Sequence, residues 1–161
     1  MRYFNNVKTL EDLKKQYFRI AKELHPDNGG TTEEMQELNN QYESLFKTVK
    51  NKNYNKDREI YEKDTKEVHE DFINIVNELL KMNRIKIEII GTFVWVSGDT
   101  KPHREKLKEM KFRWHSKKMC WYKAPDNYRR FGRKKYSMNE IRQMYGVQYE
   151  KENNHEELAY S

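Results

Sequence analysis

The chain has 161 residues, a formal net charge of +6, and similar shares of hydrophobic (35%) and charged (36%) residues. This length suits one or two small domains, and the high charged content leaves each only a lean core. No apolar run approaches a membrane span, and the N-terminus lacks the apolar region of a signal peptide. Cys120 is the single cysteine, which excludes an internal disulfide and favours a reducing compartment. We therefore expect a cytoplasmic protein that does not engage a membrane.

The N-terminal region predicts an amphipathic helix that starts after Thr9. Thr9 and Asp12 have the spacing of a capping box. The residues that follow at the spacing of one apolar face are Leu10, Leu13, Tyr17, Ile20, Ala21 and Leu24. The basic residues that fall mostly off this face are Lys14, Lys15, Arg19 and Lys22. We expect these four to form an exposed positive flank.

The helix ends at His25-Pro26-Asp27, which Asn28-Gly29-Gly30 follows. Proline lacks the N–H that a helix needs, and glycine permits the backbone angles of a tight turn. An exposed loop that presents an imidazole and a carboxylate is the expected result. Thr31 with Glu34 then predicts the cap of a second helix. The apolar residues of that helix are Met35, Leu38, Tyr42, Leu45, Phe46 and Val49, so we expect an antiparallel helical hairpin.

The segment from Leu13 to Asp27, with the helix after it, resembles a J domain, the DnaJ co-chaperone module, over about residues 1–50. Its short Asn-Gly-Gly loop is similar to the compact variant of that family. The resemblance implies docking on a DnaK-type chaperone ATPase and stimulation of its ATP hydrolysis. The stimulatory element would be His25, Pro26 and Asp27. The electrostatic docking face would be Lys14, Lys15, Arg19 and Lys22, with Tyr17 packed between the helices. Alone, the tripeptide would signify only a helix stop; its flanking helices favour the docking loop.

Residues 51–83 are expected to connect this domain to a second one. Lys50–Lys56 is polar and without periodicity, which predicts a linker. An amphipathic helix is predicted from about Asp57 to Met82. Its apolar stripe either packs onto one of the two domains or serves as a dimer interface or a substrate clamp, and we favour the first interpretation.

Residues 84–146 change to the two-residue period of strands, with a hairpin turn at Gly91-Thr92. A helix over 101–110 capped by Thr100, two strands around residues 116–118, and a last helix opened by Ser137 are also predicted. The order ββαββα gives a small α+β domain, and the whole chain is therefore of the α+β class. Residues 147–161 are acidic and are expected to be disordered.

Charge is divided unevenly between the two regions. Residues 1–83 hold 14 Lys+Arg against 16 Asp+Glu, a net charge of −2, whereas residues 84–146 hold 17 against 6, a net charge of +11. The second region is similar to a domain of obscure role found after compact J domains in bacterial proteins. That likeness implies little about function, but the excess of positive charge favours an acidic partner such as nucleic acid.

Aromatic and basic residues alternate in the second region, as binding of single-stranded nucleic acid requires. The candidate nucleic-acid-binding residues are Arg113, Lys117, Lys118, Arg129, Arg130, Arg133, Lys134 and Lys135. The three tryptophans, Trp95, Trp114 and Trp121, either stack on bases or fill a small core. We favour the core for the tryptophans, and leave the basic run open between nucleic-acid contact and solvation.

Catalytic and metal chemistry have little support in the sequence. His103, His115 and Cys120 lack a fourth partner and a recognised metal-ligand spacing. We therefore predict no metal, no cofactor and no enzymatic activity. Two functions are carried forward. The first is a co-chaperone of a DnaK-type ATPase whose second domain chooses the client or the location. The alternative is a nucleic-acid-binding adaptor that acts through the basic domain.

Overall fold

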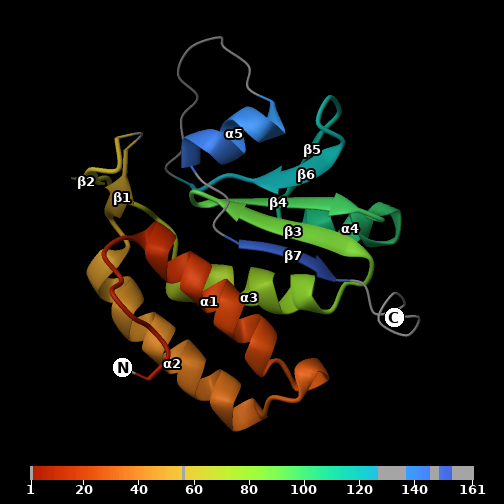
Figure 1. Cartoon of the computed structure of the whole chain (residues 1–161). Helices are drawn as coiled ribbons and strands as arrows, with labels where there is room; N and C mark the ends of the chain where they lie inside the picture. The colour runs from red at the N-terminus through yellow and green to blue at the C-terminus, as the bar shows by residue number, and fades with distance from the viewer. Residues whose placement is uncertain (1, 56, 127–136, 146–148, 154–161) are drawn as a thin grey trace. The chain divides into compact units, whose positions relative to one another are not determined.

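The computed structural model describes residues 2–55, 57–126, 137–145 and 149–153 (Figure 1). The chain divides into two compact units, residues 1–76 and 77–161, and the fold class is α+β as predicted. Helix α3 (His69–Leu80) crosses the boundary between them. None of the described helices has the length and apolar character that a membrane span needs.

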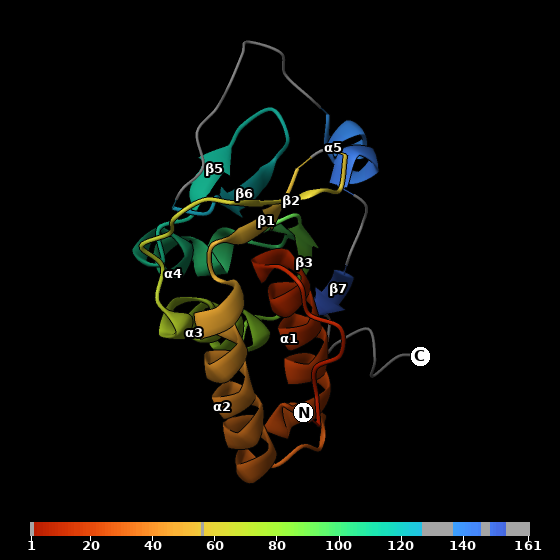
Figure 2. The same ribbon diagram turned by 90° about the vertical axis from the view of Figure 1, so that its left-hand side faces the viewer.

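The N-terminal unit is built on an antiparallel helical hairpin. Helix α1 (Leu10–Leu24) and helix α2 (Thr32–Val49) lie side by side and are joined at one end by the short 3-10 turn η1 (Pro26–Asn28) (Figure 2). The predicted capping box is confirmed, because the Thr9 hydroxyl accepts from the Asp12 N–H and the Asp12 carboxylate accepts from the Thr9 N–H. The Thr31 hydroxyl likewise accepts from the Glu34 N–H.

Aromatic rings fill the core of this unit. The ring centroids of Tyr17 and Tyr42 lie 4.9 Å apart, which confirms that Tyr17 packs between the two helices. Phe72 of α3 lies 5.9 Å from Tyr17 and 6.1 Å from Tyr42. All three residues are buried. The helical hairpin therefore completes its core with a residue that is distant in sequence.

The predicted linker and the first half of the predicted long helix are wrong. In their place, β1 (Lys52–Tyr54) and β2 (Ile60–Glu62) form an antiparallel hairpin, and α3 begins only at His69. The Asn55 side-chain carbonyl accepts from the N–H groups of Asp57 and Glu59. Such local bonds offer the backbone an alternative to a helix. The segment consequently turns back on itself.

The C-terminal unit contains a five-stranded antiparallel sheet with the order β5-β6-β4-β3-β7. Its strands are β3 (Ile85–Ile90), β4 (Phe93–Gly98), β5 (Arg113–His115), β6 (Cys120–Lys123) and β7 (Tyr149–Asn153). Its helical elements are the 3-10 turn η2 (Lys101–His103), α4 (Arg104–Glu109) and α5 (Met138–Tyr145). Gly91 has a φ of 62°, as the predicted glycine turn between β3 and β4 requires. The two predicted strand pairs are thus confirmed.

Both faces of the sheet contribute to a core. Ile85, Ile87 and Ile89 alternate along β3 and are fully buried. On the opposite face, Ile90, Trp95 and Cys120 form a cluster against which α5 packs Met138 and Ile141. Figure 1 shows α5 over one side of the sheet. The sheet therefore has apolar residues on both faces, whereas the Ile-Lys-Ile-Glu-Ile alternation of β3 by itself indicates only one apolar face.

Two details of the C-terminal unit differ from the prediction. The Thr100 side chain makes no capping hydrogen bond, because the 3-10 turn η2, which begins at Lys101 and contains Pro102, precedes α4 in place of a regular first helical turn. Residues 149–153 are not disordered: they form β7, which pairs with β3 at the edge of the sheet. Residues 154–161 of the predicted disordered tail lie outside the described residues.

The cap predicted for the last helix is confirmed, with Ser137 and Glu140 bonded reciprocally.

Candidate functional site

The His25-Pro26-Asp27 loop is a closed turn. His25 ends α1 with extended backbone angles (φ −61°, ψ 138°), which suits a residue that precedes proline. Its carbonyl oxygen then accepts from the N–H groups of Asn28 and Gly30, at 2.8 and 3.2 Å. Two hydrogen bonds to one carbonyl hold the tripeptide in a single conformation.

The imidazole and the carboxylate of this loop have different surroundings. The His25 Nδ1 accepts from the Asp27 N–H at 3.2 Å and lies 3.5 Å from the Asp27 Oδ2. Only 13% of the His25 side chain is exposed, against 59% of the Asp27 side chain. His25 therefore braces the turn, and Asp27 presents the carboxylate to solvent.

The structure explains why asparagine and two glycines follow the tripeptide. The Asn28 side-chain amide donates to the Lys22 carbonyl at 2.7 Å and so satisfies one of the last carbonyls of α1. Gly29 has a φ of 92°, a backbone angle that residues other than glycine rarely adopt. A Cβ on Gly30 would collide with the Leu24 carbonyl. The loop is thus fixed by its own sequence.

The expected positive flank of α1 is smaller than predicted. Lys14 is buried. Its Nζ lies 2.9 Å from a carboxylate oxygen of Glu67 and 5.1 Å from the centre of the Phe72 ring. The sequence reading missed this pair because 53 residues separate its members. Lys14 is therefore engaged within its own unit rather than exposed.

Lys15 is also buried rather than exposed. Its Nζ lies 2.8 Å from the Glu11 carboxylate, to which Arg58 also bonds at 2.9 Å. Burial lowers the pKa of Lys15, while the hydrogen bond that Lys15 donates to the Glu11 carboxylate opposes that shift. The i,i+4 spacing of Glu11 and Lys15 is the sequence signal that indicates this pair, whereas Arg58 leaves no local signal.

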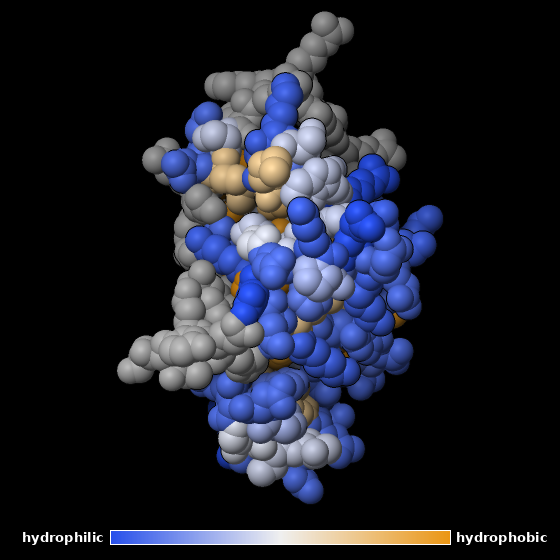
Figure 3. Space-filling model, turned by 90° about the vertical axis from the view of Figure 1, so that its right-hand side faces the viewer, coloured by the Kyte–Doolittle hydropathy of each residue, from blue (hydrophilic) through white to orange (hydrophobic). Residues whose placement is uncertain are grey.

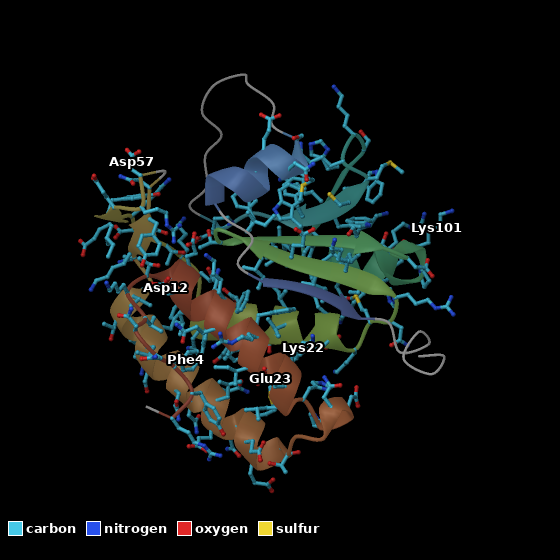
Figure 4. All side chains as sticks on the ribbon, viewed as in Figure 1. Phe4, Asp12, Lys22, Glu23, Asp57 and Lys101 are labelled. Carbon is cyan, nitrogen blue, oxygen red and sulfur yellow. The ribbon has the colours of Figure 1, made fainter. Side chains whose placement is uncertain are left out.

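The other two basic residues predicted for docking lie closer to the loop. Arg19 is exposed and Lys22 is half-buried. In Figure 4, Lys22 lies toward the end of α1 that leads into the loop, whereas Asp12 lies at the end near the β1–β2 hairpin. The structure therefore brings Arg19, Lys22 and Asp27 to the same end of the helical hairpin.

Comparison with known proteins decides the nature of this region. Residues 5–55 match the family model of the DnaJ domain. Residues 5–55 are a J domain. No curated protein and no solved structure matches the chain. The J domain indicates a co-chaperone of Hsp70-type chaperones, and such proteins are not enzymes themselves.

The J-domain match ends before the core of its own unit is complete. It includes α1, the loop and α2 but stops at residue 55, so that Phe72 lies outside it. Glu67, which pairs with Lys14, also lies outside it. In this chain the J domain is therefore extended by residues 56–76 into one compact unit.

The tryptophans of the C-terminal unit, outside the J domain, fall into two groups. Trp95 and Trp121 are each only 6% exposed, as the core interpretation predicts, whereas Trp114 is 44% exposed. Arg113 and Lys117 are exposed near it and Lys118 is half-buried. The remaining predicted nucleic-acid-binding residues, Arg129, Arg130, Arg133, Lys134 and Lys135, lie outside the described residues.

The residues considered as metal ligands lie in ordinary surroundings. His103 Nε2 is 3.2 Å from the Asn83 carbonyl oxygen, and the His115 Nδ1 accepts from the Lys118 N–H. Cys120 is buried in the cluster beneath α5. Within the part of the chain that the structure describes, no three His, Cys, Asp or Glu residues lie together as a metal site.

Proposed function

We propose that this protein docks on a DnaK-type chaperone and stimulates its ATP hydrolysis through the His25-Pro26-Asp27 loop. The observation that carries the proposal is the exposed Asp27 carboxylate in a turn closed by backbone hydrogen bonds. A carboxylate held in this way is suited to a charge-assisted bidentate bond with an arginine of the partner. Such a bond favours whichever state of the ATPase offers that arginine and so shifts its conformational equilibrium.

The docking face that we propose is narrower than the sequence predicts. Arg19 and Lys22 lie at the loop end of α1, and they supply the charge that steers an acidic partner. Lys14 and Lys15 are already paired with Glu67 and Glu11. Because both are also buried, their contribution to docking is expected to be smaller than that of the exposed Arg19.

The role that we propose for the C-terminal unit is to direct the chaperone to a client or a location in the cytoplasm. It is a separate compact unit with its own sheet and cores, and the region 84–146 has a net charge of +11.

The test is single-turnover ATP hydrolysis by a DnaK-type chaperone in the presence of the full chain. The intact protein is expected to raise the rate, and His25→Gln to abolish most of the increase, because the glutamine does not brace the turn as His25 does. His103→Gln, a matched control in the other unit, is expected to behave as the intact protein does. Equal rates with the intact protein and with His25→Gln would show that the proposal is wrong.

A further inference from the structure

Two groups of cations in the C-terminal unit, one in α4 and one in the segment 111–123, differ in their surroundings. Those of α4 are near glutamates: Arg104 lies 3.5 Å and Lys108 lies 4.0 Å from the carboxylate of Glu105. The segment 111–123, which contains β5 and β6, holds five Lys or Arg residues and no Asp or Glu. The net positive charge of this segment attracts an anionic partner.

An exposed aromatic ring lies within this basic segment. Trp114 faces Trp121 across the β5–β6 pair, with ring centroids 5.5 Å apart and planes at 60°. Because Trp121 is buried, it holds the Trp114 ring in place while 44% of Trp114 stays exposed. Met119, in the turn between the strands, is 67% exposed. Figure 3 shows a few pale and tan residues among blue ones on one face of the molecule.

The cations beside this ring are accessible. Arg113 and Lys117 are exposed, and neither has an ion pair among the described residues. Because β5 is an edge strand of the sheet, a ligand reaches both Arg113 and Trp114 although consecutive side chains point to opposite faces. The β5–β6 hairpin thus offers a fixed ring and unpaired cations within a few residues.

We propose that the β5–β6 hairpin, Arg113 to Lys123, binds single-stranded nucleic acid. One base stacks on the Trp114 ring, and phosphates contact Arg113 and Lys117. A duplex keeps its bases stacked on one another and offers such a ring no free face. An acidic peptide neutralises the cations but has no flat base for the tryptophan. The combination of ring and cations therefore favours an unpaired polynucleotide, independently of the J domain.

The test uses the full chain and a fluorescent oligo(dT) of about 20 nucleotides, longer than a typical binding site, titrated by anisotropy at several salt concentrations. Trp114→Ala is expected to weaken binding by about fivefold or more, the effect of losing one stacked base, whereas Trp114→Phe retains most of the affinity. Arg113→Gln with Lys117→Gln is expected to reduce the salt slope of log affinity by about 1.4, at about 0.7 for each phosphate contact.

The matched control is Arg104→Gln with Lys108→Gln, which removes the same charge from α4, where the cations lie near Glu105. This control variant is expected to bind oligo(dT) far more tightly than the variant with Arg113→Gln and Lys117→Gln. The proposal is overturned if oligo(dT) does not bind, or if Trp114→Ala binds as the intact protein does. It is also overturned if both charge variants lose affinity equally, or if a duplex or polyglutamate binds as tightly as oligo(dT). Near-ultraviolet circular dichroism confirms that each variant is folded, and Trp114→Phe supplies a folded reference for Trp114→Ala.

Discussion

Lys14 of the N-terminal unit and Lys117 of the C-terminal unit are the same residue type in opposite circumstances. Lys14 is buried and ion-paired with Glu67, whereas Lys117 is exposed with no ion pair among the described residues. The N-terminal unit thus uses much of its basic helix for its own packing and exposes the Asp27 carboxylate. The C-terminal unit exposes cations and one tryptophan. Burial therefore distinguishes lysines that stabilise the fold from lysines that are available for binding, whereas the sequence alone does not.

The substitution with the largest expected effect tests whether the N-terminal unit depends on an aromatic ring that α3 adds to the helical hairpin. Phe72→Ala should lower the free energy of unfolding by about 3–5 kcal/mol, because it removes a buried ring that packs against both Tyr17 and Tyr42. Urea unfolding followed by far-ultraviolet circular dichroism measures the change. Tyr61→Ala, at an exposed position of the same unit, should cost less than about 0.5 kcal/mol. Equal costs for the two variants would contradict the extended core.

The lysine comparison itself gives the next largest effect. Lys14→Met should destabilise the protein by about 3 kcal/mol, because it leaves the Glu67 carboxylate, whose side chain is only 11% exposed, without its partner. Lys117→Met should stay within about 0.5 kcal/mol of the intact protein. Chemical denaturation of both variants checks this, and adding Glu67→Gln to Lys14→Met should recover part of the loss. A comparable cost at Lys117 would remove the distinction between the two lysines.

High pH should destabilise the N-terminal unit. Burial raises the pKa of both Tyr17 and Tyr42 above 10, so the folded state keeps protons that the unfolded state loses. Their contribution is complete below pH 10 and is lost as pH rises above it, at up to about 1.4 kcal/mol per pH unit for each tyrosine. Urea midpoints measured below and above pH 10 test this. If Tyr17→Phe with Tyr42→Phe loses stability as steeply as the intact protein, other groups are responsible.

The smallest effect separates the two buried tyrosines. The Tyr17 hydroxyl donates to the Asn39 side-chain carbonyl at 2.7 Å, whereas the Tyr42 hydroxyl is buried without a hydrogen-bond partner in the described residues. Tyr17→Phe should therefore cost about 1 kcal/mol, and Tyr42→Phe should be neutral or slightly stabilising. Thermal unfolding of the two variants at neutral pH provides the measurement. The reverse order would mean that the Tyr42 hydroxyl has a partner.

Local signals account for most of what the sequence predicted correctly. The Thr9 capping box, the glycine turn at Gly91 and the reciprocal cap at Ser137 each depend on residues within four positions of one another. The helical spacing of the later apolar residues predicts a helix across residues 57–68, and this prediction is wrong because β2 lies there and α3 begins only at His69. The turn there rests on the side-chain hydrogen bonds of Asn55.

Long-range contacts account for what the sequence could not supply. The pairing of Lys14 with Glu67 and the packing of Phe72 depend on how distant segments fold onto α1. A helical wheel places Lys14 off the apolar face and cannot show what covers it. The exposure of Trp114 but not of Trp121 likewise follows from the position of β5 at the edge of the sheet.

The measurement closest to the central claim compares Asp27→Asn with Asp57→Asn in single-turnover ATP hydrolysis by a DnaK-type chaperone. Both aspartates are exposed in the N-terminal unit, and both substitutions remove one charge at almost constant size. Asp27→Asn is expected to lose most of the stimulation even at saturating concentration, and Asp57→Asn to retain it. Full stimulation by Asp27→Asn, or an equal loss with both variants, would contradict the assignment of the loop carboxylate as the stimulatory group.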